Sequence, residues 1–475
     1  MSRSRAHVVV VGAGSAGAVV TRRLVDAGHH VTLVEAGPDV VEGSPSGLSS
    51  PSFFDALGEP GWTWSDLHAR RVAGQDERFY ARGRGVGGSS AVNAMIGLWG
   101  ETDDYDRWER DHGCEGWSWS DVQPVFMQMP IPMRTPRPVE IGPIGRAVVE
   151  IGRARNWVEH VGPGAVGPLG RDIGRCRLTQ HPDGRRASAF DVYVESIRRR
   201  RELVIRAETH VERILFADDQ VVGVGLSDGS VVDADAVIVT AGAIETPRLL
   251  QRSEIDNPAI GRGLQDHAAA TFTVVRRDSV DPSSLAVGVV GRFSSGESPA
   301  DLQILPIEHL GRGAEGSDTS AFGVLNVALM NVQSRGRVDA TTIEFDMLSD
   351  ERDVDALVRG VGEVRGWFDE SPLRAVVDAV YVDDRGTRLE DLGDDEESLR
   401  GWVRAVTGDY VHAAGSCSMG RRGESVVDNR GRSWDRRGLW IADASIMPRL
   451  PRANTHLPTV MVAERVAEFL NDEIS

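Results

Sequence analysis

Two histidines lie in short runs of small and polar residues where a reactive side chain would have room. His412 begins "HAAGSCSM", and His456 stands in "NTHLPT". An imidazole with an ordinary pKa of about 6.5 accepts a proton near neutral pH, so both residues are candidates for proton transfer. A lone histidine is more often buried against a backbone carbonyl, and for His267 in "GRGLQDH" we favour that structural interpretation. We expect no metal site, because neither candidate has an HxxxH motif or a carboxylate cluster beside it.

The elements that would position this chemistry begin at the N-terminus. Residues 8–11 are four consecutive valines, typical of a parallel strand buried on both faces. Gly12, Gly14 and Gly17 follow as GxGxxG, and a helical pattern then leads to a second strand that ends at Glu35. Such glycines bring backbone N–H groups against a pyrophosphate, and an acid about 20 residues later accepts hydrogen bonds from a ribose. The segment predicts dinucleotide binding and leaves open the choice between NAD and FAD.

Composition excludes several classes of function. The chain of 475 residues has a net charge of −18, which disfavours nucleic acid or an anionic membrane surface as a partner. All 53 basic residues are arginine, so chemistry that needs a Schiff-base or P-loop lysine is excluded. The 3 cysteines form no CxxC pair, which argues against a dithiol motif. With no apolar run near the ~18 residues of a membrane span and no signal-peptide pattern, we expect a cytoplasmic protein without such a span.

The stretch "ARGRGVGGSSAVNAMIGLWG", residues 81–100, has a backbone bare enough to lie against a planar ring. It resembles the first signature of the glucose–methanol–choline (GMC) oxidoreductase family. The resemblance implies bound FAD, with Ser89 and Asn93 near the flavin. Members that attach the flavin covalently use a histidine just before that asparagine. Val92 occupies the position here, which implies non-covalent FAD.

The resemblance extends over nearly the whole chain. "GAIETPRLL", residues 242–250, matches the second family signature, and residues 438–470 resemble the closing segment. From the residues alone, we expect the helix in 242–250 to have Thr246 as N-cap and Pro247 at its first position. The cofactor contacts that the resemblance implies are made by Gly12, Gly14, Ser15, Ala16, Gly17, Glu35, Ala36, Arg84, Gly88, Ser89, Asn93, Val211, Ala241, Asp443, Ala444 and His456.

The family resemblance also implies roles for the two histidines. His412 matches the catalytic histidine of the family's His-x-x-Gly-(Ser/Thr) motif, and His456 matches a second residue that is histidine or asparagine. The implied reaction oxidises a small-molecule alcohol to a carbonyl compound. His412 would remove the hydroxyl proton, a hydride would pass to flavin N5, and His456 would hold the substrate oxygen. The electron acceptor would be oxygen or a quinone-type compound.

Three alternative functions stay open on the sequence alone. The same fold serves a few lyases or decarboxylases, which a pair of catalytic histidines argues against only weakly. A non-catalytic FAD-binding protein would keep the glycine fingerprint without needing His412 and His456 together. A dehydrogenase that uses NAD alone would purify without colour.

The expected fold class is α/β. A Rossmann-like FAD-binding domain of GMC type would be joined to a substrate-binding domain built on an antiparallel sheet with helices on its outer face. Two lobes are expected, because 475 residues exceed the size at which one core keeps growing. By the family pattern, the FAD-binding domain takes residues 1–130, 185–266 and 409–475. The substrate-binding domain then takes residues 131–184 and 267–408.

Overall fold

A parallel sheet forms around the run of valines near the N-terminus. In the computed structural model, which describes residues 5–40, 45–161, 170–312 and 319–473, strand β1 spans His7–Val11. It pairs in parallel with β2 (His30–Val34) and β11 (Ala236–Val239). The sheet has the order β20-β11-β1-β2-β7, with β7 at Leu203–Arg206 and β20 at Leu439–Ile441. Because helices and loops cover both faces, its strands need apolar residues without alternation.

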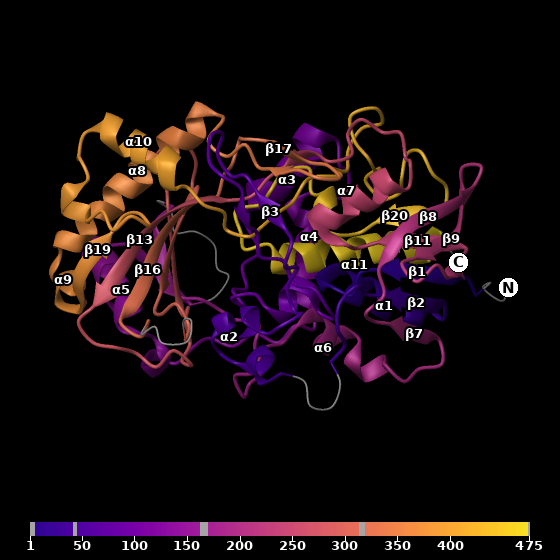
Figure 1. The fold of residues 1–475 in the computed structure, drawn as a ribbon, viewed down its shortest axis with the longest axis horizontal. Helices are drawn as coiled ribbons and strands as arrows, with labels where there is room; N and C mark the ends of the chain where they lie inside the picture. Colours follow the sequence, from indigo (N-terminus) through magenta and orange to yellow (C-terminus); the bar gives the residue numbers. More distant parts are fainter. Residues whose placement is uncertain (1–4, 41–44, 162–169, 313–318, 474–475) are drawn as a thin grey trace.

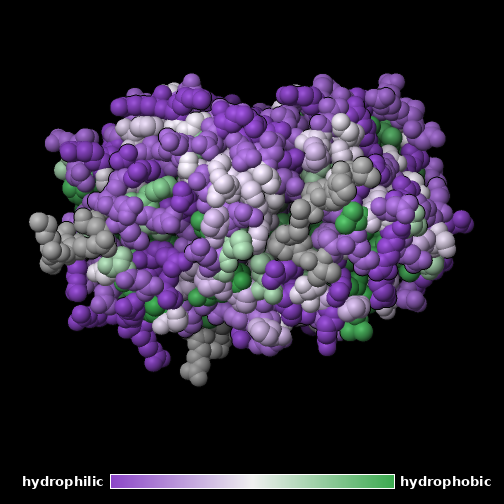
Figure 2. All heavy atoms as spheres, turned by 180° about the vertical axis from the view of Figure 1, so that it is seen from behind, coloured by the Kyte–Doolittle hydropathy of each residue, from purple (hydrophilic) through white to green (hydrophobic). Residues whose placement is uncertain are grey.

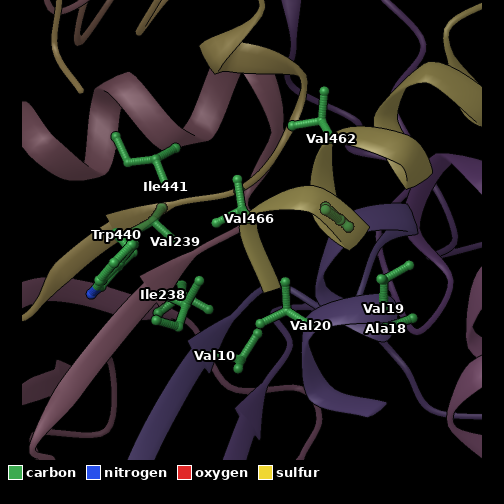
Figure 3. Packing of buried hydrophobic residues seen from close by; sticks show 14 of the residues in the cluster. Val10, Ala18, Val19, Val20, Ile238, Val239, Trp440, Ile441, Val462 and Val466 are labelled. Carbon is green, nitrogen blue, oxygen red and sulfur yellow. The ribbon is translucent and has the colours of Figure 1, made fainter. Parts of the chain in front are cut away.

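Two helices from opposite ends of the sequence pack on this sheet. Helix α1 (Ser15–Ala27) follows β1 and ends at Gly28 in the left-handed region, with φ 94°. Helix α11 spans His456–Glu473. Figure 3 shows Val20 of α1 and Val466 of α11 close to Ile238 of the sheet, all within one buried cluster. This packing fixes where α11 begins, and therefore where His456 lies.

A second, mostly antiparallel sheet builds the other lobe (Figure 1). Its order is β19-β13-β16-β15-β14-β6-β5, and only β5 and β6 run parallel. The strands are β5 (Val158–Val161), β6 (Asp172–Arg175), β13 (Ala268–Arg276), β14 (Val289–Phe293), β15 (Leu302–Ile307), β16 (Phe322–Leu329) and β19 (Val377–Tyr381). The helices beside it are α5 (Pro143–Ala154), α8 (Glu351–Arg365), α9 (Ser371–Val376) and α10 (Glu396–Val406). The predicted fold class is confirmed.

Smaller elements complete the structure. A three-stranded sheet contains β8 (Val211–Ala217), β9 (Gln220–Leu226) and β10 (Val231–Asp233). Strand β12 (Arg262–Leu264) pairs with β17 (Gly336–Val338), which pairs with β18 (Ile343–Glu344). Short strands β3 (His68–Ala69) and β4 (Arg78–Phe79) pair with each other. Besides α7 (Gly242–Arg252), the remaining α-helices are α2 (Phe53–Leu57), α3 (Thr102–His112), α4 (Trp119–Gln128) and α6 (Ala189–Tyr193).

The predicted start of the helix in 242–250 is wrong. Helix α7 spans Gly242–Arg252, so it begins before Thr246 and carries Pro247 inside it. A proline has no N–H for the carbonyl one turn earlier, which here belongs to Ala243. The hydroxyl of Ser416 donates to that carbonyl at 2.6 Å. A tertiary hydrogen bond therefore supplies the donor that the proline lacks.

The surface seen in Figure 2 is largely hydrophilic, with apolar side chains in small separate patches. This agrees with a content of charged residues, 26% of the chain, that is typical of a globular protein. Among the described residues, no helix combines the length and the apolar character that crossing a membrane would need.

Candidate active site

A cavity of about 400 Å³ receives residues from both large sheets. Its floor comes from the loops after β1, β2 and β11, and strands β15 and β16 contribute to its wall. The carboxyl ends of parallel strands are where α/β folds bind ligands. The predicted site residues that line the cavity are Gly12, Gly14, Ser15, Ala16, Glu35, Ala36, Gly88, Ser89, Asn93, Val211, Ala241, His412, Asp443, Ala444 and His456.

Two residues predicted to contact the cofactor do not line the cavity but lie next to segments that do. Gly17 lies inside α1, where a Cβ atom would come within 1.8 Å of the carbonyl oxygen of Gly12. Arg84 donates from Nη2 to the carbonyl oxygen of Ala36 at 2.8 Å. Both residues hold lining segments in place.

Glycines leave a narrow floor without side chains. Gly12 has φ +97°, and a Cβ there would meet the carbonyl oxygen of Thr240 at 2.8 Å. A Cβ on Gly88 would lie 2.8 Å from the Cα of Gly14, so the loop after β1 and the 81–100 segment touch through backbone. Backbone N–H groups at the start of α1 therefore face the cavity without obstruction, as a diphosphate requires.

The Glu35 carboxylate ties three of these loops together. It accepts backbone N–H bonds from Ala13 at 2.8 Å, Gly37 at 2.9 Å and Gly85 at 2.9 Å. Burial raises the pKa of Glu35, and the three hydrogen bonds act in the opposite direction. The contact with a ribose that the sequence predicts for Glu35 stays a prediction.

A buried arginine that the sequence analysis missed fixes Asn93. Arg186 donates from Nη1 to the carbonyl oxygen of Asn93 at 2.5 Å and to its Oδ1 at 2.7 Å. Burial lowers the pKa of Arg186 to about 9. Its positive charge also contributes to the low pKa of His456.

His412 sits in a hydrogen-bond network that the sequence analysis did not predict. Its Nδ1 lies 2.9 Å from Nδ1 of His267, and its Nε2 lies 3.4 Å from Nδ2 of Asn454. Burial first, and then His267 and the positive charge of Arg82, lower the pKa of His412 well below its usual value. The ring is therefore neutral at pH 7, the state in which an imidazole accepts a proton.

His456 lies at the first turn of α11 and faces the glycine loop. Its Nδ1 is 3.1 Å from the hydroxyl oxygen of Ser15. Its Nε2 is buried and has no hydrogen-bond partner among the described residues, although the ring lines the cavity. Burial and then Arg186 lower the pKa of His456 to about 4. A buried polar atom left without a partner is costly, so this nitrogen is placed to meet a ligand.

Asn454 and His267 are the residues near His412 that the sequence analysis did not select as functional. Asn454 was visible in the quoted "NTH" element, two positions before His456. His267 does make the backbone hydrogen bond expected of a structural histidine, with Nε2 3.1 Å from the carbonyl oxygen of Pro451. Its contact with His412, 145 residues away along the chain, has no local sequence signal.

Comparison with known proteins identifies the family. The model of the N-terminal part of the GMC oxidoreductases matches residues 6–269, and the model of the C-terminal part matches residues 330–463. This chain is a member of the GMC oxidoreductase family. It is therefore an FAD-dependent oxidoreductase that acts on CH–OH groups.

Relatives and solved structures match nearly the whole length of this GMC oxidoreductase. A 5-(hydroxymethyl)furfural oxidase of Methylovorus sp. is 30% identical, covering 97% of this chain and 98% of the relative. An oxygen-dependent choline dehydrogenase of Paraburkholderia xenovorans is 28% identical, covering 98% and 94%. The crystal structure of pyridoxine 4-oxidase from Mesorbium loti superposes with a TM-score of 0.88 at 25% identity, covering 99% of this chain and 100% of that one.

The cavity of this GMC oxidoreductase fits FAD. The bare floor at Gly12, Gly14 and Gly88 suits a diphosphate, and the unpartnered Nε2 of His456 faces the same space. The flavin would lie against the 81–100 segment, next to Ser89 and to Asn93, which Arg186 holds in place.

Asp266, His267 and His412 bring their ligand atoms within 4.8 Å of one another, a spacing that a metal site also shows. Their hydrogen bonds explain the grouping without an ion. Asp266 accepts from Tyr80 Oη at 2.7 Å and from the backbone N–H groups of His267 at 2.7 Å and His412 at 2.9 Å. The two Nδ1 atoms are 2.9 Å apart, whereas two nitrogen ligands of one tetrahedral zinc ion are separated by about 3.3 Å.

Proposed function

We propose that this GMC oxidoreductase oxidises uncharged, largely apolar alcohols and that His412 accepts the hydroxyl proton. The observation that carries the proposal is a neutral, buried His412 at the edge of a cavity whose carboxylates all have partners. His412 has a lowered pKa and lines the same cavity as the glycine floor. An alcohol placed there would meet an imidazole ready to take its proton.

Apolar side chains dominate the part of the cavity nearest the second sheet. They are Ile96, Leu305, Ile307 and Tyr410. The hydroxyl of Tyr410 donates to Oε1 of Gln303 at 2.9 Å, so the ring is held rigidly by a partner outside the lining. Such a wall gives favourable contacts to hydrocarbon or aromatic carbon atoms.

One amide in this wall offers a polar contact. Asn326 of β16 accepts a hydrogen bond at Oδ1 from the Thr271 hydroxyl at 2.5 Å. Asn326 lines the cavity, and its Nδ2 group is a further hydrogen-bond donor. A substrate with an acceptor oxygen or nitrogen at the end remote from its alcohol would use it.

The described carboxylates that line the cavity are already paired. Asp409 accepts from Nε of Arg71 at 2.6 Å, and Glu245 accepts from Arg248 at 3.0 Å. Glu35 and Asp443 accept backbone N–H bonds on the cofactor side, Asp443 from Gly242 at 2.8 Å. A cationic alcohol such as choline would therefore leave water without gaining a free negative partner, which is unfavourable.

The chain's own groups account for the proton movement. The alcohol O–H donates its proton to Nε2 of His412, beside Asn454. Nδ1 of His456 lies 3.1 Å from the Ser15 hydroxyl oxygen. In the tautomer whose Nδ1 accepts from this hydroxyl, the proton of His456 is on Nε2, where it would stabilise the negative oxygen. FAD, when bound, supplies the acceptor for the hydride. The N-terminal end of α11 adds a positive dipole at the same place.

A matched pair of substrates tests the proposal. Choline and 3,3-dimethylbutan-1-ol have the same shape and differ in charge. We expect the neutral alcohol to bleach the flavin anaerobically with a kcat/KM about 100-fold higher, because an unpaired buried cation costs several kcal/mol. Faster bleaching by choline would contradict the proposal and favour a choline-oxidising enzyme.

Several finer assignments belong to the same proposal. The FAD-binding domain would comprise residues 1–130, 185–266 and 409–475, with residues 131–184 and 267–408 forming the substrate-binding domain. Pairing of β12 with β17 gives the two parts a shared sheet. Val92, at the position where a histidine would attach the flavin, supports non-covalent FAD. The electron acceptor would be oxygen or a quinone-type compound. The protein would act in the cytoplasm.

A further inference from the structure

His267 is fully buried beside the proposed base. The His267 and His412 rings meet edge to face, with centroids 5.1 Å apart and an interplanar angle of 87°. One carboxylate oxygen, Oδ1 of Asp266, accepts the backbone N–H groups of both histidines, at 2.7 and 2.9 Å. The backbones of the two histidines are thus held by the same oxygen atom.

The hydrogen bonds of His267 determine where its proton lies. Its Nε2 is 3.1 Å from the carbonyl oxygen of Pro451, and a carbonyl only accepts, so Nε2 carries the hydrogen. Burial lowers the pKa of His267 to about 3, although the carbonyl groups of Pro451 and Met330 favour the charged form. The ring is therefore neutral, and its Nδ1 presents a lone pair.

That lone pair fixes the tautomer of His412. The two Nδ1 atoms are 2.9 Å apart, so one must donate to the other. His267 has no hydrogen on Nδ1, and His412 must therefore carry one there. In a neutral His412 this leaves the lone pair on Nε2, next to the donor amide Nδ2 of Asn454 at 3.4 Å.

We infer that His267 is a positioning residue that holds His412 in the Nδ1–H tautomer and so keeps on Nε2 the lone pair that accepts the substrate proton. This inference rests on the proposed role of His412. A neutral acceptor orients the ring as a carboxylate does in other base–orienter pairs, without adding a negative charge. When His412 takes up the proton, its Nδ1–H bond to His267 is unchanged.

The tautomer is measured directly in the holoprotein. With ¹⁵N-labelled histidine rings, the His412 signals, assigned by their loss in His412→Ala, should show a hydrogen on Nδ1 and none on Nε2 at pH 7. A hydrogen on Nε2 would overturn the inference. This readout does not depend on turnover, so it stays valid if His412 proves not to be the base.

Two substitutions provide the kinetic test. His267→Phe removes the acceptor, and we expect anaerobic flavin reduction to slow by about 100-fold with little change in KM. His267→Asn places a carbonyl oxygen near the Nδ1 position and should recover at least about tenfold of that loss. Equal losses in both variants would assign His267 a packing role only. If His267→Phe fails to fold, the wild-type tautomer still decides the question.

Discussion

Gly17→Ala should yield a protein that binds no FAD, the largest effect that we expect from any glycine-to-alanine substitution. The added Cβ would lie 1.8 Å from the carbonyl oxygen of Gly12 and 2.7 Å from Oγ1 of Thr240. Neither neighbour can yield without moving α1 away from β1, and with it the glycine floor of the site. Flavin absorbance per mole of purified protein should fall to the background level, and the thermal midpoint of unfolding should drop.

Two further alanine variants separate folding from cofactor contact. Gly401 lies in α10 with no atom within 4 Å of an added Cβ, so Gly401→Ala should keep its FAD and its stability. Gly14→Ala meets only the Cα of Gly88 at 3.8 Å, an ordinary contact. Loss of FAD from Gly14→Ala with an unchanged midpoint would therefore report contact with the cofactor itself. A Gly17→Ala protein with a full complement of FAD would refute the packing argument.

His412→Ala should keep FAD and lose about 10²–10⁴-fold in turnover with a neutral alcohol, the usual contribution of a general base. The hydrogen bonds of His412 go to His267, Asn454 and Asp266, and none goes to the glycine floor. Removing the ring therefore leaves the cofactor's supports in place. The ratio of flavin to protein and kcat at saturating alcohol are the measurements.

Two comparisons sharpen this prediction. His456→Ala should lose less activity, because its proposed role is to stabilise the substrate oxygen while His412 still takes the proton. His68→Ala, at an exposed ring in β3, should retain full activity. If His412→Ala is isolated without FAD, the residue supports the cofactor site, contrary to the role proposed here.

The sequence predicted the first lobe well because its signals are local. Four valines, the glycine fingerprint and a left-handed Gly28 act within one β-α-β unit, and each element appears where its pattern placed it. The start of α7 was missed because the donor to Ala243 comes from Ser416, far along the chain. The strands of the second sheet were harder to predict, since a strand such as β14, buried throughout, lacks polar alternation.

The site residues that the sequence predicted also have local signals, whereas those it missed depend on contacts between distant parts of the chain. Motifs selected the cavity-lining glycines, His412 and His456, because each lies in a short stretch with a recognisable pattern. His267, which fixes the tautomer of His412, and Arg186, which helps to lower the pKa of His456, were not selected for these roles. Each contacts its target across the fold: Arg186 is 93 residues from Asn93 and His267 is 145 residues from His412. Only the three-dimensional arrangement shows that neutral histidines are paired with each other.

Proton removal by His412 is tested most directly by anaerobic mixing of 3,3-dimethylbutan-1-ol with FAD-loaded wild type and His412→Ala, with and without added imidazole. We predict fast flavin bleaching in the wild type, bleaching slowed by about 10²–10⁴-fold in the variant, and partial recovery as neutral imidazole replaces the missing ring. Equal bleaching rates in the two proteins at equal FAD content would contradict the assignment of His412 as the base.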